Sequence, residues 1–211
     1  MELQIEKQAR GTRIIEGDQA KERRLILNQL IAIAETYHFD EIILPSVEPA
    51  DIYTNKAGKE ILKQMYVFDD KKKRKLCLRP EVTATVQLIA NHFWQGKKEK
   101  RVWYFEKCWR YERPQAGRYR EFYQFGLEII NPQNKFAKEL LIDIATEMVK
   151  LKANDGVVNY SVKRGLDYYI EDGFEISCEQ LGTQKQVCGG GAYKQGIGFA
   201  VGFDRLMLCS K

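Results

Sequence analysis

Apolar residues recur at helical spacing in three stretches of the chain. Over residues 17–38 they form one broad face, and Asp18 is a suitable N-cap for the helix that this spacing predicts. The predicted apolar face consists of Leu25, Leu27, Leu30, Ile31, Ile33, Ala34 and Tyr37. The same periodicity predicts helices over residues 82–93 and 134–152.

Short runs of aliphatic, aromatic and β-branched residues occupy most of the remaining chain, and such runs favour strands. They span residues 41–49, interrupted by Pro45, and 65–70, 75–81, 102–109, 121–129, 158–162, 167–170, 174–181, 184–191 and 197–208, the last passing from a strand into a helix. Strands clustered between flanking helices predict an α+β fold with an antiparallel β-sheet flanked by helices. We expect one domain over residues 1–211.

The composition is that of an ordinary globular protein, with 44% hydrophobic and 30% charged residues among 211. The five cysteines are scattered and never in CxxC spacing. Neither a zinc site nor a disulfide framework is therefore indicated, and a reducing, cytoplasmic location is expected. The polar N-terminus excludes a secretory signal, and no apolar run reaches the ~18 residues that a membrane span needs.

Basic residues gather in two places, on a chain with a net charge of +5. Residues 71–75 are five consecutive basic residues between two strand-like runs. They could bind RNA, but a solvated hairpin turn is the favoured interpretation. Residues 110–128 combine four arginines, three acids and five aromatics around a Pro-Gln-Ala-Gly turn. Guanidiniums fixed on such a hairpin can bind phosphate oxygens in pairs, and an aromatic ring can hold a base. A charged, exposed hairpin is the alternative.

Within this second segment, the run RYERPQAGRYREF resembles motif 2 of the class II aminoacyl-tRNA synthetases, and of the histidyl enzymes in particular. The runs LRPEVTA, RGLDYY and GGGAY resemble three further segments of the histidyl enzymes, and GFAVGFDRL resembles motif 3. The resemblance places motif 1 at about 18–50, motif 2 at about 102–130, two histidine signatures at 163–169 and 188–195, and motif 3 at 196–208. It implies a catalytic domain that forms a homodimer through motif 1.

The resemblance also implies ATP and Mg²⁺ as ligands and assigns roles to individual residues. Those implied for ATP are Arg110, Glu112, Arg118, Phe122 and Arg205. Those implied for histidine are Glu81, Thr83, Arg110, Gln124, Glu128, Arg164, Tyr169 and Tyr193. Arg110 and Arg164 would be the catalytic cations, and Glu128 with Tyr169 would recognise the imidazole. Glycines 198 and 202 would flatten a strand so that adenine can lie on it. No protein metal site is indicated.

The implied reaction is ATP-dependent activation of histidine to histidyl-adenylate, with transfer to tRNA or another acceptor. Adenylate formation passes through a pentavalent phosphorus with extra negative charge, which fixed guanidiniums and Mg²⁺ stabilise. One simpler role stays open for Glu81, because an acid at this position could merely cap the helix that starts at Val82.

The sequence also departs from the family pattern. Ala192 and Lys194 stand where the histidyl enzymes carry an arginine and an acid. Residues 131–160 hold one helix and a turn where the family places a helical insertion, and the end soon after Arg205 leaves no room for an anticodon-binding domain. Two alternatives therefore stay open: a non-catalytic, histidine-binding paralogue resembling the regulatory subunit of ATP phosphoribosyltransferase, and a fragment of a longer enzyme.

Overall fold

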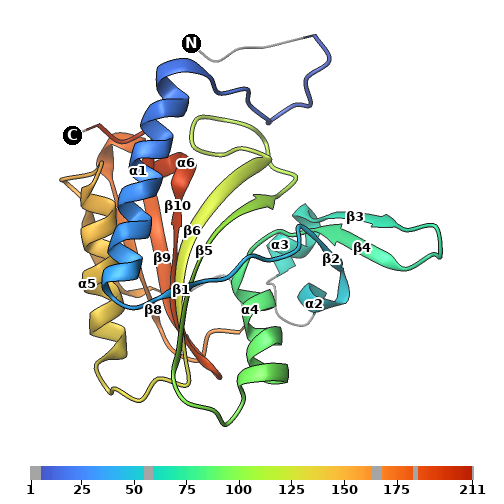
Figure 1. The fold of residues 1–211 in the computed structure, drawn as a ribbon. Coiled ribbons are helices and arrows are strands. Elements are labelled where there is room, and N and C mark those ends of the chain that lie inside the picture. Colours follow the sequence, from blue (N-terminus) through green and yellow to red (C-terminus); the bar gives the residue numbers. More distant parts are fainter. Residues whose placement is uncertain (1–5, 55–58, 163–167, 183–184, 211) are drawn as a thin grey trace.

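The computed structural model describes residues 6–54, 59–162, 168–182 and 185–210, which build on a seven-stranded sheet (Figure 1). The strand order is β1-β5-β6-β10-β9-β8-β7. The bounds are β1 (Asp40–Glu41), β5 (Lys100–Trp109), β6 (Glu121–Ile130), β7 (Val157–Val162), β8 (Gly173–Ser177), β9 (Gln186–Tyr193) and β10 (Gly196–Gly202). All neighbours are antiparallel except β1 and β5, which run parallel. The predicted α+β fold, with a mostly antiparallel sheet flanked by helices, is confirmed.

Helices cover both faces of this sheet. The long helices α1 (Gly17–Thr36) and α5 (Ala137–Lys150) pack on one face (Figure 1). On the other face lies α4 (Thr83–Ile89), which continues as a π-helical turn over Ala90–Trp94. Because side chains alternate along a strand, β6 sends Phe125, Leu127 and Ile129 toward α1 and α5, and its even-numbered residues toward α4. The functional side chains of β6 are among these even-numbered residues.

A second, three-stranded sheet stands beside the first, in the order β2-β4-β3 (Figure 1). Its strands are β2 (Val47–Pro49), β3 (Tyr66–Asp69) and β4 (Lys75–Leu78), next to the short helices α2 (Asp51–Thr54) and α3 (Lys59–Gln64). The buried Arg79 joins the two sheets: its guanidinium donates to the Pro45 carbonyl at 2.8 Å and pairs with Glu106 at 2.6 Å. Removing one partner of such a buried pair typically costs about 3–5 kcal/mol.

The first helix is predicted correctly in extent but not in detail. It ends at Thr36, and its N-cap is Glu16 rather than Asp18. Its buried residues are Ile26, Leu30 and Ala34, whereas Leu25 is 63% exposed. The run of apolar residues in this helix is nearly continuous, so periodicity alone could not decide which side of the helix faces the sheet.

Three predicted strands differ from the structure. The run 41–49 is divided at Pro45 between two sheets, because proline lacks the N–H that a continuous ladder needs. The described part of 167–170 contributes one isolated bridge, between Tyr169 and Tyr193, and no strand. The run 174–181 ends as a strand at Ser177 and continues as a 3₁₀ turn over Glu179–Leu181. The chain closes on β10 and the short helix α6 (Phe203–Leu206), as predicted.

Candidate active site

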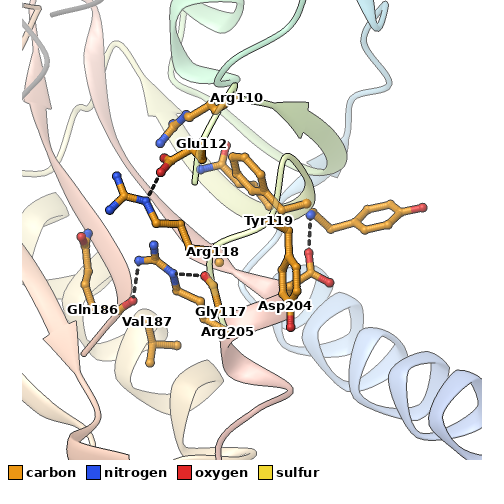
Figure 2. A pocket seen from close by; sticks show the side chains of 13 residues that line it. Arg110, Glu112, Gly117, Arg118, Tyr119, Gln186, Val187, Asp204 and Arg205 are labelled. Carbon is orange, nitrogen blue, oxygen red and sulfur yellow. Dashed lines mark hydrogen bonds and ion pairs between the residues drawn. The ribbon is translucent and has the colours of Figure 1, made fainter. Parts of the chain in front are cut away.

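The five residues that the sequence assigns to ATP line one cavity (Figure 2). The hairpin of β5 and β6 supplies most of its walls, and β9, β10 and α6 supply the rest. The lining residues are Arg110, Glu112, Gly117, Arg118, Tyr119, Phe122, Tyr123, Gln124, Gln186, Val187, Gly202, Asp204 and Arg205. The chain thus brings together side chains that are up to 95 positions apart, from Arg110 to Arg205.

Hydrogen bonds hold the cavity's arginines in place. Arg205 donates from Nε to the Gly117 carbonyl at 2.8 Å and from a terminal nitrogen to the Gln186 carbonyl at 3.0 Å (Figure 2). Arg118 pairs with Glu112 across the mouth of the loop (Figure 2). Burial lowers the pKa of Arg205, and the nearby charges of Arg110 and Arg118 lower it further. Three guanidiniums gathered in one cavity form a site for a polyanion such as a triphosphate.

Glu128 forms the centre of a second, fully buried cluster on the same face of the sheet. Its carboxyl group accepts from the Thr83 hydroxyl at 2.7 Å and from the Tyr193 hydroxyl at 2.9 Å. Burial raises the pKa of Glu128 to about 8, although both hydroxyl bonds act in the opposite direction. A carboxyl oxygen has two lone pairs, so each can still accept from an imidazole N–H.

Gly198 makes room for this carboxyl group. It lies directly opposite Glu128 in the register of β10 and β6. A Cβ atom added to Gly198 would overlap Oε2 of Glu128 and come within 2.8 Å of the Leu127 carbonyl oxygen. Gly198 therefore leaves space for the Glu128 carboxyl group. The sequence suggested a different role, in which Gly198 flattens the strand so that adenine can lie on it. At Gly202 an added Cβ would meet only ordinary contacts of 3.5 Å or more.

Glu81 combines both of the roles considered for it. Its Oε1 accepts from the Ala84 backbone N–H at 2.9 Å, so it does cap α4. Its Oε2 accepts from the Tyr168 hydroxyl at 3.2 Å, and the side chain is buried. Burial raises the pKa of Glu81, while Arg110 acts to lower it. Arg110 itself donates from Nε to the Pro80 carbonyl at 2.8 Å, so it stands between the arginine cavity and the carboxyl cluster.

The remaining candidates fall in three groups. Gln124 lies in the cavity and accepts from the Cys108 thiol at 3.2 Å. Tyr169 is half-buried and forms the backbone bridge with Tyr193. Arg164 lies outside the described residues, so its predicted role stays a prediction.

Sequence reasoning missed several residues that organise the site. Tyr168 contacts Glu81, and Asp204 binds Arg23 at 2.8 Å and also pairs with Arg13. The Arg13 guanidinium lies 3.6 Å above the ring of Tyr119 in the motif 2 loop. A hint was present in the sequence, because Asp204 directly precedes the candidate Arg205, but no local pattern indicates a partner 191 positions away.

The described residues contain no group of three or more acids, cysteines or histidines that could hold a metal ion. Magnesium usually binds to one or two carboxylates together with substrate phosphates, so the absence of a dedicated cage is compatible with Mg²⁺ that arrives with a nucleotide. Glu112 lines the cavity and is a carboxylate that could share such an ion.

The fold and the cavity together define a class II aminoacyl-tRNA synthetase catalytic core. A family model described as histidyl-tRNA synthetase matches residues 11–161. A histidine–tRNA ligase from Archaeoglobus fulgidus is 30% identical, with 93% of this chain and 74% of the relative covered. The crystal structure of apo Staphylococcus aureus histidyl-tRNA synthetase superposes with a TM-score of 0.79 at 27% identity, over 97% of this chain and 70% of that one. The chain belongs to the histidyl-tRNA synthetase family.

A third comparison shows the fold alone. A Bacillus halodurans structure titled as an ATP phosphoribosyltransferase regulatory subunit/histidyl-tRNA synthetase matches with a TM-score of 0.78 at 15% identity, over 96% of this chain and 82% of that one. The Archaeoglobus alignment extends over 303 positions, more than the 211 residues of this chain, so that relative carries residues that have no counterpart here. No helix among the described residues is long and apolar enough to cross a membrane.

Proposed function

We propose that this chain activates histidine with ATP, forming histidyl-adenylate and pyrophosphate, and transfers the histidyl group to tRNA or another acceptor. The observation that carries the proposal is the position of Arg110. It lies at the junction of a cavity lined by three arginines and a buried cluster that contains Glu81 and Glu128. Adenylation requires this junction, because the carboxylate of the amino acid must meet the α-phosphate of the nucleotide.

The proposed step needs no protein nucleophile. A carboxylate oxygen of histidine attacks the α-phosphorus, and the bond to the β-phosphate oxygen breaks, so that pyrophosphate leaves with the electron pair. Arg110 would neutralise the charge that develops on the α-phosphate, and Arg118 and Arg205 would hold the outer phosphates. Mg²⁺ would supply further positive charge at the phosphates. Phe122 lies on the cavity wall, 5.3 Å from the Arg110 guanidinium, where it could stack on the base.

Histidine would be selected by the buried cluster. Glu81, Thr83 and Gln124 would receive the α-ammonium group, and Glu128 with Tyr169 and Tyr193 would surround the imidazole. Glu128 could accept a hydrogen bond from an imidazole N–H in addition to its bonds from Thr83 and Tyr193. A side chain without such an N–H would not make this bond, and a site built to hydrogen-bond a substrate N–H discriminates against analogues that lack it.

We further propose that residues 1–211 act as one catalytic domain, with motif 1, motif 2, the two histidine signatures and motif 3 in the order found in the sequence. The absence of a counterpart to the long stretch in the Archaeoglobus relative leaves fewer surfaces for selecting a tRNA. The acceptor could therefore be a tRNA or a different molecule.

One observation favours a second function. Ala192 and Lys194 replace an arginine and an acid of the second histidine signature, and Lys194 is exposed at the β9–β10 turn. A histidine-binding regulatory paralogue could tolerate these losses. It would have no reason to keep Arg110, Arg118 and Arg205 in one cavity, so ATP binding separates the two functions.

Histidine-dependent ATP–pyrophosphate exchange tests the proposal. We expect exchange with histidine and with no other amino acid, and a loss of up to about 100-fold in Arg110→Gln, since a hydrogen bond to a charged group contributes up to about 3 kcal/mol. Arg113→Gln is the matched control, because Arg113 lies in the same loop but is exposed and does not line the cavity. No exchange, with histidine binding retained in calorimetry, would instead support the regulatory paralogue.

A further inference from the structure

The tip of the β3–β4 hairpin carries five consecutive basic residues, the last of which is the first residue of β4. Its residues Lys71, Lys72, Lys73, Arg74 and Lys75 are all exposed. Asp69 and Asp70 directly precede the run, so residues 69–75 hold five basic and two acidic side chains, a local net charge of +3. Figure 1 shows that the β3–β4 hairpin extends away from the large sheet, so this charge is presented at a projecting tip.

Asp70 fixes the shape of this tip. One of its carboxylate oxygens accepts from the backbone N–H of Lys72 at 2.8 Å and of Arg74 at 2.9 Å. The other accepts from Nε of Arg74 at 2.6 Å. These bonds lower the pKa of Asp70, and the ion pair with Asp70 neutralises the charge of Arg74. The four lysines keep their charge without a counter-ion, because within the described residues none of them takes part in an ion pair.

The turn also departs from what a purely structural turn would use. Lys73 has a φ of 63°, in the left-handed region where glycine or asparagine is normally found. Four lysines held close together repel one another. A solvated turn gains nothing from either feature, since a shorter charge run and a glycine would make a more stable hairpin. Local choices that oppose stability are typical of binding sites.

We propose that this basic tip, defined as Lys71, Lys72, Lys73 and Lys75, binds the phosphate backbone of RNA. Lysine ammonium groups act as point charges toward phosphates and carry no planar, base-reading geometry, so the contact would not depend on sequence. A rigid turn loses little conformational freedom when its side chains meet a phosphate row. The choice of RNA over other polyanions rests on the proposed function, whereas the anion-binding character rests on the tip itself.

Binding of a tRNA transcript and of a short RNA duplex with unrelated sequence, each over a range of salt concentrations, tests the inference. The variant has all four lysines of the basic tip changed to glutamine. We expect its affinity for both RNAs to fall at least about tenfold, and the slope of log affinity against log salt to fall by about three, because each phosphate contact contributes roughly 0.7 to 0.9. Pyrophosphate exchange should be unchanged, since the tip lies outside the cavity, and this readout separates failure here from failure of the proposed function.

The matched control changes Lys63, Lys97, Lys98 and Lys150, four exposed lysines elsewhere, to glutamine. It alters the net charge equally, so an equal loss of RNA affinity in the control would overturn the inference. Unchanged affinity and salt slope in the tip variant would overturn it as well. If polyglutamate competes as well as RNA at equal charge, the result would indicate an acidic protein, rather than RNA, as the partner.

A single substitution provides an independent test. Lys73→Gly removes one charge and relieves the left-handed backbone at that position. We expect the midpoint of thermal unfolding to rise by about 2–4 °C, as for a stabilisation of about 1 kcal/mol in a chain of this size, while RNA affinity falls severalfold. A variant that is more stable and binds RNA as tightly as the natural chain would contradict a functional reason for this lysine.

Discussion

Glu128 is the residue whose replacement distinguishes most sharply between the two substrates of the proposed reaction. Glu128→Gln keeps the size of the side chain and can still accept one of the two hydroxyl bonds from Thr83 and Tyr193. Above pH 8, where the carboxyl group of Glu128 is ionised, only the natural side chain can present a negative charge to an imidazole, so the two proteins are compared there. We expect the dissociation constant for histidine to rise about 10- to 100-fold, as for a lost bond to a charged group. The dissociation constant for ATP should change less than about threefold. Calorimetry with each ligand measures both, and an equal loss of both affinities would remove Glu128 from histidine recognition.

The protonation of Glu128 also makes the free energy of unfolding depend on pH. Its pKa is about 8 in the folded chain, against 4.5 for an ordinary glutamate, so the folded state binds the proton more tightly than the unfolded state. The resulting stability is complete below pH 4.5 and is lost as pH rises through 8. Within that window the free energy of unfolding should fall by up to about 1.4 kcal/mol per pH unit through this group.

Chemical denaturation at several pH values, compared between the natural chain and Glu128→Gln, isolates this contribution. Burial also raises the pKa of Glu48 and of Glu81, so the natural chain carries further slope of the same sign. Subtracting the slope of Glu128→Gln from that of the natural chain removes the contributions of Glu48 and Glu81. Identical slopes would show that Glu128 is ionised in the folded chain at neutral pH.

Gly198 shows how one backbone position controls this carboxyl group. In Gly198→Ala the new methyl group would occupy the place of the Glu128 carboxyl group and would also lie only 2.8 Å from the Leu127 carbonyl oxygen, so side chain and backbone would both have to shift. We expect a loss of about 1–3 kcal/mol in the free energy of unfolding, as for other overpacked cores. Gly202→Ala, in the same strand, is the control and should cost less than about 1 kcal/mol. Equal effects in denaturant unfolding would mean that Glu128 can move aside without cost.

At the scale of elements, Arg13 connects three parts of the site. It belongs to the segment before α1, stacks on Tyr119 of the motif 2 loop and pairs with Asp204 of α6 (Figure 2 shows Tyr119 and Asp204 at one side of the cavity). Asp204 is buried and precedes Arg205. We therefore expect Arg13 to act as a positioning residue for the loop that contains Arg118 and the helix that contains Arg205.

Arg13→Met should raise the Michaelis constant for ATP about 5- to 30-fold, corresponding to 1–2 kcal/mol, and leave that for histidine nearly unchanged. Asp204 keeps its bond to Arg23, so the variant should fold. Arg10→Met is the control, because Arg10 is exposed in the same segment. Steady-state exchange kinetics measure both constants, and a parallel rise for both substrates would indicate general loosening of the fold.

The elements that the sequence predicts well are those whose signals are local. The β5–β6 hairpin, α5 and the basic turn all follow from strand composition or helical spacing within a short window. The interruption of 41–49 follows from Pro45 in the sequence. The sheet that each half joins could not be predicted, because it depends on a distant strand: β5 for Glu41 and β4 for Val47.

The candidate site divides in the same way. The resemblance to the synthetase motifs assigns the five cavity residues to ATP, because each of them lies in a motif with a recognisable sequence. The contacts that hold these residues are long-range, such as Thr83 with Glu128 and Arg13 with Asp204. They become visible only when the sheet brings the strands together, so the structure adds the supporting residues while the sequence indicates the candidates.

At the scale of the whole molecule, the sheet separates two tasks. One face carries α1 and α5 and forms the main apolar core, and the opposite face carries the cavity and the buried carboxyl cluster. The three-stranded sheet and its basic tip stand apart from both (Figure 1). The Archaeoglobus relative carries additional residues within the aligned region.

Motif 1 provides the surface for the last prediction, which concerns assembly. Ile43, in the connection between β1 and β2, is 81% exposed, and Val47, the first residue of β2, is 46% exposed. Exposed apolar side chains that form a contiguous patch mark an interface with another molecule. We expect the chain to sediment as a homodimer through this region, and Ile43→Asp to yield a monomer, because a carboxylate buried in an apolar interface without a partner is strongly unfavourable. Phe136→Asp is the control: Phe136 is 55% exposed but precedes α5, outside motif 1. If the dimer orders the β5–β6 hairpin, pyrophosphate exchange should fall with dissociation. A natural chain that sediments as a monomer at assay concentrations and still catalyses exchange would show that motif 1 serves the fold alone.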